Sequence, residues 1–388
     1  MNTLYARIAT LLAGYAILIT GNGLLGTLVS LRLTSPAFSS TTVGIVQSAY
    51  YLGFMLGALL SGRLIARIGY HRAFAVFAVV VACTSLGYAI GDLPLAWLLL
   101  RLVAGFSMAG IFSMLESLLH ASADNRVRGR VIAFYMMTTY LGAASGQLLL
   151  NLASPSGFEL FSLVAVLFSA SLLPILVASK PTASAPGKEP SRLDKTGIMR
   201  VVFSSPLGVG GCVLAGLLNS VFYTLMPVYL KQAGFSIPAL SGVMFSALLT
   251  ALMFQWPTGF LSDHIDRRKV LAGSCLLIGG LCLILVSGPD GTVLLWLVCF
   301  FAATVFTVYP VSVALVNDWV SSDLRLSASA AVLLMFSVGG CAGPIFASIF
   351  IGSLGPAGLF WFCITAVSAF LVGCLLSLWN PQSKTRSP

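Results

Sequence analysis

Two short segments, GRLIARIGYHR at residues 62–72 and GFLSDHIDRRK at residues 259–269, decide the organisation of this chain. Each segment is basic, begins with glycine and follows a long apolar run. The second begins 197 residues after the first, which is close to half of the 388 residues. Two imperfect copies of one charged loop, half a chain apart, predict that the sequence is built as an internal repeat.

The composition identifies the apolar runs as membrane spans. The chain is 58% hydrophobic and 8% charged, whereas soluble proteins carry about 25% charged residues. A soluble chain of this length could not cover its surface with so few charges, so we expect a polytopic membrane protein. The net charge of +10 does not indicate a nucleic-acid partner, because the basic residues are spread over short segments between the apolar runs.

The apolar runs predict twelve spans. A helix that crosses a bilayer needs about 20 mainly apolar residues. The segments that qualify are 6–31, 41–65, 73–91, 94–119, 130–152, 157–178, 203–230, 237–261, 270–287, 291–316, 326–352 and 356–379. The stretch KPTASAPGKEPSRLDKTGIMR, at residues 180–200, follows the sixth span and has the composition of a flexible linker. We therefore expect an all-α fold with a six-helix bundle in residues 1–179, a cytoplasmic linker in residues 180–202 and a second six-helix bundle in residues 203–388.

The basic residues predict the orientation of these spans. With the N-terminus inside the cell, 18 of the 21 Lys and Arg residues lie in cytoplasmic segments. Only Arg32 and Lys231 lie outside, and Arg101 lies within the fourth span. The positive-inside rule then places both termini in the cytoplasm, with the chain in the plasma membrane, the inner membrane of a bacterium. Anionic membrane lipid is the expected neighbour of the basic loops.

The shift of 197 residues aligns more than the two loops. It pairs Arg128 with Arg325 and Gly142 with Gly339. The other matches are Asn22, Thr27 and Leu28 with Asn219, Thr224 and Leu225, and Gly146 with Gly343. An even number of spans in each half makes the repeat parallel, and such repeats place a substrate path between the halves.

The first loop resembles the signature of the major facilitator superfamily, G-x-L-x-D-R-x-G-R-[RK], which lies between the second and third helices and again between the eighth and ninth. This copy has both glycines, Gly62 and Gly69, together with Arg67 and Arg72. It has Ala66 where the family has an acid.

The second loop resembles the same signature and departs from it elsewhere. It has Gly259, the acid Asp263 and the basic residues Arg267 and Arg268, but Asp266 stands where the second glycine is expected. The segment ESLLHASADNRVRGRVIAFYMMTTYLGAASGQLLL, at residues 116–150, resembles the YcaD-like branch of the superfamily. The resemblance implies a twelve-helix transporter that works by alternating access, without a settled substrate.

The resemblance also implies a cytoplasmic gate formed by these loops. In the family the loop acid caps a helix of the opposite half, and an acid at a helix N-terminus is worth about 0.3–1 kcal/mol. Asp263 is the candidate cap for the fifth helix, whose start carries Arg128 and Arg130. Ala66 cannot cap the eleventh helix, and Asp323 lies in the segment before it. We therefore predict an asymmetric gate in which Asp263 is the stronger latch.

Only two charged residues are clear candidates for an intramembrane position, Arg101 and Glu116, both in the fourth span. Intramembrane charges are costly and are a functional hypothesis by default. Arg101 begins RLVAGFSMAG, which resembles the family's fourth-helix pattern and implies a role in substrate binding or proton coupling. The alternative is a structural Arg101 bound to first-span carbonyls and Asn22.

Glu116 is the candidate proton site because a carboxyl group in a low-dielectric setting can load and release a proton. The alternative is a gate ion pair with Arg126, Arg128 or Arg130. Glu116 and Arg101 are 15 residues apart in the sequence, about 22 Å along a helix, which is too far for direct pairing.

Uncharged polar and aromatic residues complete the predicted substrate cavity. Each forms either an interhelical hydrogen bond or a cavity contact, because amides in hydrocarbon need partners. With Arg101, the candidates are Asn22, Gln47, Tyr51, Gln147, Asn219, Tyr223, Gln255, Trp256 and Tyr309.

A cavity of amides and aromatics suits a small neutral or amphipathic solute. We therefore expect a monomeric secondary active transporter that exports such a solute in exchange for protons, without cofactor or metal. A metabolite importer or uniporter, and a transport-inactive sensor on the same fold, are the alternatives. An enzyme is not expected, because the sequence has no H-E-x-x-H, G-x-S-x-G or Walker motif.

Overall fold

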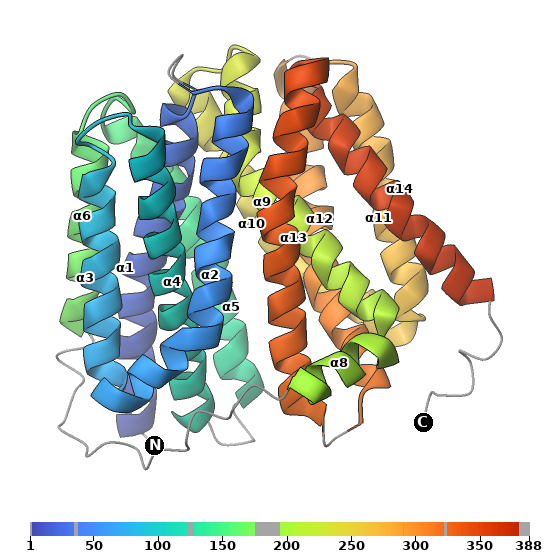
Figure 1. Cartoon of the computed structure of the whole chain (residues 1–388), viewed down its shortest axis with the longest axis horizontal. Helices are drawn as coiled ribbons and strands as arrows, with labels where there is room; N and C mark the ends of the chain where they lie inside the picture. The colour runs from blue at the N-terminus through green and yellow to red at the C-terminus, as the bar shows by residue number, and fades with distance from the viewer. Residues whose placement is uncertain are drawn as a thin grey trace. The chain divides into compact units, whose positions relative to one another are not determined.

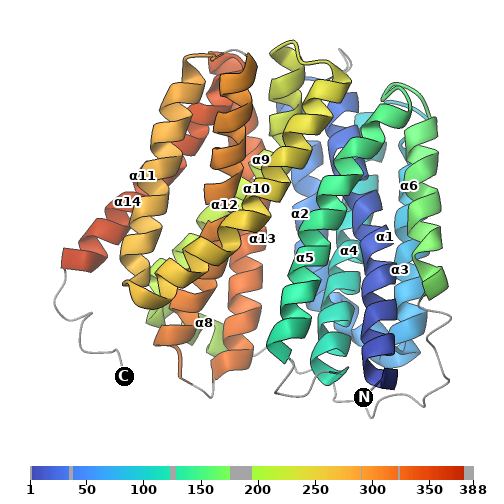
Figure 2. The same cartoon turned by 180° about the vertical axis from the view of Figure 1, so that it is seen from behind.

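The computed structural model describes residues 2–34, 38–122, 128–174, 195–289, 291–321 and 324–379. The regular structure in these ranges is helical (Figures 1 and 2). In the first half the helices are α1 (Asn2–Arg32), α2 (Ser40–Ile68), α3 (Tyr70–Gly87), α4 (Pro94–Ser122), α5 (Arg128–Leu148), the 3-10 turn η1 (Leu149–Leu152) and α6 (Glu159–Ala170). In the second half they are α8 (Lys195–Ser204), α9 (Pro206–Gln232), α10 (Ile237–His264), α11 (Arg267–Val286), α12 (Gly291–Trp319), α13 (Arg325–Leu354) and α14 (Gly358–Trp379).

The twelve expected spans correspond to twelve of these helices. Nine helices among the described residues, α1, α2, α4 and α9 to α14, are long and apolar enough to cross a membrane. Two more are shorter apolar helices, at Arg72–Gly87 in α3 and Glu159–Pro174 in and after α6. The remaining one is α5, which is 21 residues long. The predicted all-α, multi-pass fold is therefore confirmed.

The helices of the two halves begin in the same register. Adding 197 to the first residues of α2, α3, α4 and α5 gives positions 237, 267, 291 and 325, which are the first residues of α10, α11, α12 and α13. The halves are thus repeats in backbone as well as in sequence.

Equivalent glycines make equivalent contacts in the two halves. A Cβ atom on Gly146 of α5 would lie 2.3 Å from the carbonyl oxygen of Thr20 in α1. A Cβ on Gly343 of α13 would lie 2.7 Å from the carbonyl oxygen of Leu217 in α9, which is Thr20 shifted by 197. Gly142 over Ala16 and Gly339 over Val213 form a second equivalent pair. Only glycine allows these helices to approach so closely.

The chain divides into two compact units, and each is described by itself. The first comprises residues 1–38, 49–191 and 235–245, and the second comprises residues 39–48, 192–234 and 246–388. In the first unit α1 packs on α5 and α6, and α3 packs on α4 and α6. In the second unit α9 packs on α12 and α13, and α11 packs on α12 and α14.

Helix α8 occupies residues that the sequence assigned to the end of the linker and the start of the seventh span. Its Val201 is fully buried against Val209, Val316 and Ala331 of α9, α12 and α13. The linker therefore includes a helix packed on the second unit. The rest of the predicted linker, residues 180–194, lies outside the described residues.

The loops at residues 62–72 and 259–269 make their turns by different means. Gly69 precedes α3 with φ 83°, a left-handed conformation that favours glycine, and no side chain caps the helix. Asp266, its equivalent, precedes α11 with φ −51° and accepts a hydrogen bond from the Arg268 backbone N–H through its side chain. A capping carboxylate thus replaces the glycine that the family signature predicts at this position.

Candidate functional site

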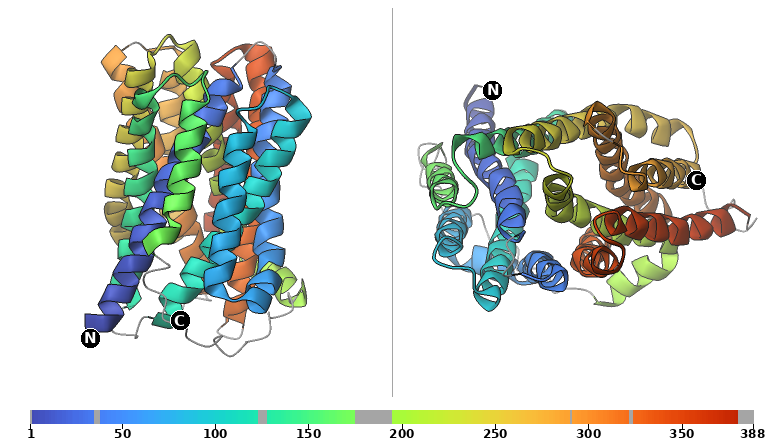
Figure 3. Two further views of the ribbon diagram at one scale, coloured as in Figure 1. Left: turned by 90° about the vertical axis from the view of Figure 1, so that its left-hand side faces the viewer. Right: turned by 90° about the horizontal axis from the view of Figure 1, so that it is seen from above.

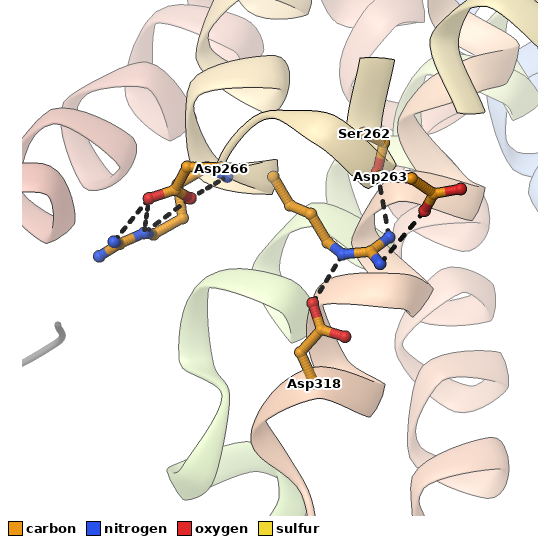
Figure 4. Close-up of polar contacts among 6 residues, drawn as sticks. Ser262, Asp263, Asp266 and Asp318 are labelled. Atoms are coloured by element: carbon orange, nitrogen blue, oxygen red, sulfur yellow. Dashed lines mark hydrogen bonds and ion pairs between the residues drawn. The ribbon is translucent and has the colours of Figure 1, made fainter. Parts of the chain in front are cut away.

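A guanidinium bound by two carboxylates lies at one end of the second unit (Figure 4). Arg267, the first residue of α11, contacts Asp318 Oδ2 at 2.6 Å through Nε. It also contacts Asp263 Oδ1 at 3.4 Å and donates to Ser262 Oγ at 3.1 Å. The contacts join the ends of α10 and α12 to the start of α11, so one side chain fixes three helices.

The closer of the two carboxylates is the better shielded. The Asp318 side chain is 47% exposed and the Asp263 side chain is 68% exposed. Salt and water screen an exposed pair more strongly. We therefore infer that the ion pair with Asp318 is the stronger of the two ion pairs of Arg267.

A pocket of about 200 Å³ lies beside this cluster, between α10 and α12. Its lining residues are Gln255, Thr258, Gly259, Ser262, Asp263, Arg267, Thr307, Pro310, Val311 and Ala314. The pocket is therefore lined by uncharged hydrogen-bonding groups and by the guanidinium of Arg267, which is already paired with Asp263 and Asp318.

A proline explains the position of Gln255. Pro310 lies inside α12 and has no N–H, so it leaves the carbonyl of Phe306, four residues earlier, without its helical donor. Gln255 Nε2 donates to that Phe306 oxygen at 3.3 Å. The amide of α10 thereby satisfies a carbonyl of α12 at the wall of the pocket.

Next to the cluster, Arg268 anchors the turn between α10 and α11. Its side chain, 10% exposed, contacts Asp266 Oδ2 at 2.7 Å and donates to the Ser377 carbonyl of α14 at 3.1 Å. The side-chain hydrogen bond from Arg268 lowers the pKa of Asp266, which is outside the apolar part of the helices. Arg268, predicted as a gate residue, is thus engaged within its own unit.

The lowered pKa of Asp266 predicts a pH-dependent stability. A depressed pKa contributes stability above the unfolded value of about 3.9, and this is lost as the pH falls through the folded pKa. Asp266→Asn keeps a capping acceptor but removes the charge, so it should lower the free energy of unfolding at neutral pH by about 1 kcal/mol or less. Thermal unfolding in detergent at pH 7 and near pH 3 checks this. The difference from wild type should shrink in acid, and an equal difference at both pH values would contradict it.

In the first unit, Arg101 of α4 is buried with only 4% exposure. Its guanidinium carbon lies 4.8 Å from the centre of the Tyr50 ring in α2. The Tyr50 ring in turn lies 5.3 Å from the Tyr51 ring. A cation–π contact with α2 is thus shown for this arginine, and its contact with first-span carbonyls and Asn22 stays a prediction.

Glycine makes that contact possible. A Cβ on Gly105, one turn after Arg101, would lie 1.9 Å from the Tyr50 carbonyl oxygen. A Cβ on Gly53 would lie 1.9 Å from the Leu102 carbonyl oxygen. Because α2 and α4 touch backbone to backbone here, the Arg101 side chain lies over the Tyr50 ring.

Glu116, further along α4, has a tyrosine as a neighbour. Its Oε1 accepts a hydrogen bond from Tyr135 Oη of α5 at 3.4 Å. The Tyr135 ring lies 5.1 Å from the buried Tyr15 ring, and Tyr15 Oη lies 2.9 Å from Thr139 Oγ1. Two hydroxyl contacts and a ring contact thus connect the carboxylate with the α1–α5 interface. Of the predicted ion-pair partners of Glu116, Arg126 and the Arg128 side chain lie outside the described residues.

Among the predicted cavity residues, Gln147 is used inside the first unit. Its Oε1 accepts from Thr27 Oγ1 at 2.6 Å, and its Nε2 donates to the Gly23 carbonyl at 3.0 Å. This amide joins α5 to α1, which is an interhelical packing role.

The other predicted cavity residues lie in both units and are described one by one. Gln255 lines the pocket, whereas Trp256 beside it is 77% exposed and stacks on Phe260. Tyr223 and Tyr309 contact Phe306 and Phe336 through ring edges. Gln47 and Asn219 are buried, and Asn22 is half-buried.

The predicted gate residues lie at helix ends. Gly62 and Arg67 are in the last turns of α2, Arg72 is in the first turn of α3, and Arg128 and Arg130 begin α5. Gly259 lines the pocket, and Asp323 lies outside the described residues. The cap of Asp263 on α5 stays a prediction, and the partner shown for Asp263 is Arg267.

Sequence reasoning missed Asp318, Tyr15 and Thr139. Asp318 could have been noticed because it is an acid in the last turn of α12. This end of α12 lies next to the basic loop at residues 259–269, which contains Arg267. Tyr15 and Thr139 are 124 residues apart and carry no pattern that links them.

Comparisons with known proteins agree on one family. The model of the Major Facilitator Superfamily matches residues 11–309 and 246–388. The chain is 31% identical over 380 residues to the uncharacterized MFS-type transporter YcaD of Escherichia coli O45:K1 (strain S88 / ExPEC), covering 97% of each chain.

Two solved structures have the same fold. The nucleoside transporter NupG matches with a TM-score of 0.81 at 14% identity, over 98% of this chain and 100% of that one. A bacterial homolog of the human lysosomal transporter Spinster, in an inward-facing and unoccupied conformation, matches with a TM-score of 0.73 at 15% identity, over 97% and 95%.

Proposed function

This chain belongs to the major facilitator superfamily, and we propose that it is a secondary active transporter that moves a small neutral or amphipathic solute by alternating access. It is a multi-pass membrane protein of the MFS type. The observation that carries the choice of solute is the pocket between α10 and α12.

The chemistry of that pocket favours an uncharged solute. Its one cation, Arg267, already contacts Asp318 and Asp263. Gln255, Thr258 and Thr307 supply neutral polar groups, and Val311 and Ala314 supply apolar surface. At about 200 Å³ the pocket accommodates a small solute or part of a larger one, since full ligand sites are usually about 300–1,000 Å³.

Transport by purified protein in proteoliposomes tests this proposal. Counterflow is measured with neutral, cationic and anionic compounds of similar size, under pH gradients of either sign. Nucleosides, the solutes named for one structure of the same fold, belong in the neutral set. Flux confined to charged compounds would contradict the proposed solute class, and no flux with any compound under any gradient would favour a transport-inactive sensor.

Thr258→Val is expected to weaken solute binding at the pocket. It removes one hydroxyl from the lining with little change in volume. Losing one hydrogen bond costs about 0.5–1.5 kcal/mol, which is a rise of about 2- to 10-fold in KM. The matched control is Thr250→Val in the same helix, where the hydroxyl donates to the Ser246 carbonyl at 2.8 Å. An equal change in KM for both variants would place the solute elsewhere.

We further propose that transport is coupled to protons through Glu116 and runs as efflux, with uptake of a metabolite as the rival direction. Glu116 is the acid within α4, and the hydroxyl of Tyr135 donates to it. When ionised, the carboxylate accepts the hydrogen bond from the Tyr135 hydroxyl. When protonated, it carries an O–H that can donate to the same hydroxyl, so the carboxyl group can change charge and stay in contact with its neighbour. The sign of the pH gradient that drives accumulation distinguishes efflux from uptake.

Glu116→Gln is expected to abolish gradient-driven accumulation and to preserve solute exchange. Glutamine keeps the size and an acceptor oxygen but cannot release a proton. Proteoliposome flux with and without an imposed pH gradient measures the two activities separately. Tyr135→Phe, which removes only the donor, should remain coupled. Accumulation that stays fully gradient-dependent in Glu116→Gln would exclude this residue as the coupling site.

A further inference from the structure

The exposed face of α8 carries two kinds of side chain in separate halves. Met199 and Phe203 are 53% and 75% exposed, and Thr196 and Arg200 are also exposed. At about 100° per residue these four positions form one continuous arc of about 100°. Met199 and Phe203 lie on one side of the arc, and Thr196 and Arg200 lie on the other.

The opposite face of α8 fixes the helix on the second unit. Val201 is fully buried, and Ile198 and Val202 are partly buried against the same cluster. The helix packs on α13 and α9. Within this unit it lies at the outer side of the helices, across the end of α13 (Figures 1 and 3). The helix is therefore held in place by one face while the other remains at the periphery.

The position of α8 in the chain places this outer face at a membrane surface. Ser205 separates α8 from α9, which is long and apolar enough to cross a membrane. A helix that directly precedes a spanning helix and lies across it meets the boundary between acyl chains and headgroups. A split arc of apolar and cationic side chains matches that boundary, since apolar groups enter the acyl region and cations contact anionic headgroups.

We propose that α8 is an interfacial helix that binds anionic phospholipid, with Met199 and Phe203 inserted among the acyl chains and Arg200 at the headgroup. The predicted orientation makes this the cytoplasmic leaflet, where anionic lipid is expected. The start of α9 is thereby tied to the lipid surface through a helix packed on α13. The inference rests on the membrane location of the chain and is independent of the transported solute.

Tryptophan fluorescence with brominated lipid tests the contact. Phe203→Trp and Thr196→Trp are reconstituted in phosphatidylcholine vesicles in which either phosphatidylglycerol or phosphatidylcholine carries bromine on its acyl chains. Wild type in the same vesicles gives the emission of the six native tryptophans, which is subtracted. The added emission of Phe203→Trp should be quenched more strongly than that of Thr196→Trp. Brominated phosphatidylglycerol should quench Phe203→Trp more efficiently than brominated phosphatidylcholine at the same mole fraction.

A charge variant isolates the headgroup contact. One cation near an anionic surface raises the affinity for anionic lipid about fivefold. The double variant Phe203→Trp/Arg200→Gln should therefore lose most of the preference for phosphatidylglycerol. The matched control is Phe203→Trp with Arg63→Gln, which removes an exposed arginine of α2 and should keep the preference. Phe203→Trp that no brominated lipid quenches would show that protein covers this face, and equal quenching by the two lipids would show no anionic site. Either result overturns the proposal.

Discussion

Arg101→Gln is expected to reduce transport by about 10- to 100-fold or more while the protein remains folded. Arg101 is 4% exposed and lies over the Tyr50 ring. A hydrogen bond from a charged donor to the solute, the role predicted for Arg101, is worth about 1.5–3 kcal/mol, and its loss lowers the rate by about 10- to 100-fold or more. The fold should survive because a charge within the membrane costs about 2.5–3.5 kcal/mol, and its removal offsets the loss of a cation–π contact worth about 2 kcal/mol.

Two companion variants separate charge from geometry. Arg101→Lys keeps the charge and loses the planar group, so its transport should be intermediate. Tyr50→Phe keeps the aromatic face and should retain most of the transport. Proteoliposome flux per folded molecule, together with the thermal unfolding midpoint, gives both measurements. A fall in transport that only follows a fall in the unfolding midpoint would assign Arg101 a structural role.

Gly53→Ala is expected to lower the free energy of unfolding by about 3 kcal/mol, the upper end of the usual cost of overpacking. The added Cβ would lie 1.9 Å from the Leu102 carbonyl oxygen, and backbone cannot rotate aside as a side chain can. α2 and α4 must therefore separate, and the separation also moves Tyr50 away from Arg101. Transport should fall together with stability.

Gly26→Ala is the matched control, inside α1 and six residues before its last residue. Nothing lies within 4 Å of a Cβ at this position. Since alanine favours a helix over glycine by about 1 kcal/mol, this variant should be as stable as wild type or more stable. Thermal unfolding in detergent compares the two directly. Equal effects of the two substitutions would contradict close contact between α2 and α4.

The sequence was sufficient to predict the fold because the decisive signals are local and repeated. Apolar length located the spans, and the 197-residue offset located the repeat. The same offset relates the helix starts Tyr70 and Arg267 to each other. Helix α8 was not anticipated, since its ten residues lie in a stretch whose proline, serine and charge indicate a linker.

The site was only partly predictable because its contacts join residues that no spacing rule relates. Arg267 and Asp318 are 51 residues apart, and Glu116 meets Tyr135 on the next helix. Intramembrane charge drew attention to Arg101 and Glu116 of α4, and the structure shows Arg101 buried and Glu116 exposed beside the Tyr135 hydroxyl. It did not reveal their neighbours, which depend on how α2, α4 and α5 are rotated about their axes. Gln255 and Trp256 show the same limit, since adjacent residues on a helix point in different directions.

The shared register of the two halves has a consequence for how this protein arose. Duplication of a six-helix chain would account for the shared helix starts and for the shared places where glycine meets a carbonyl. It did not preserve charge, since the equivalents of Arg101 and Glu116 are Val298 and Val313. In the other direction, the equivalents of Asp263, Arg267 and Asp318 are Ala66, Tyr70 and Ala121. The two halves share the helix contacts made by glycine, but each carries a different set of charged residues. A chimaera of two identical halves would therefore keep these contacts and would lack either the charges of α4 or the Arg267 cluster.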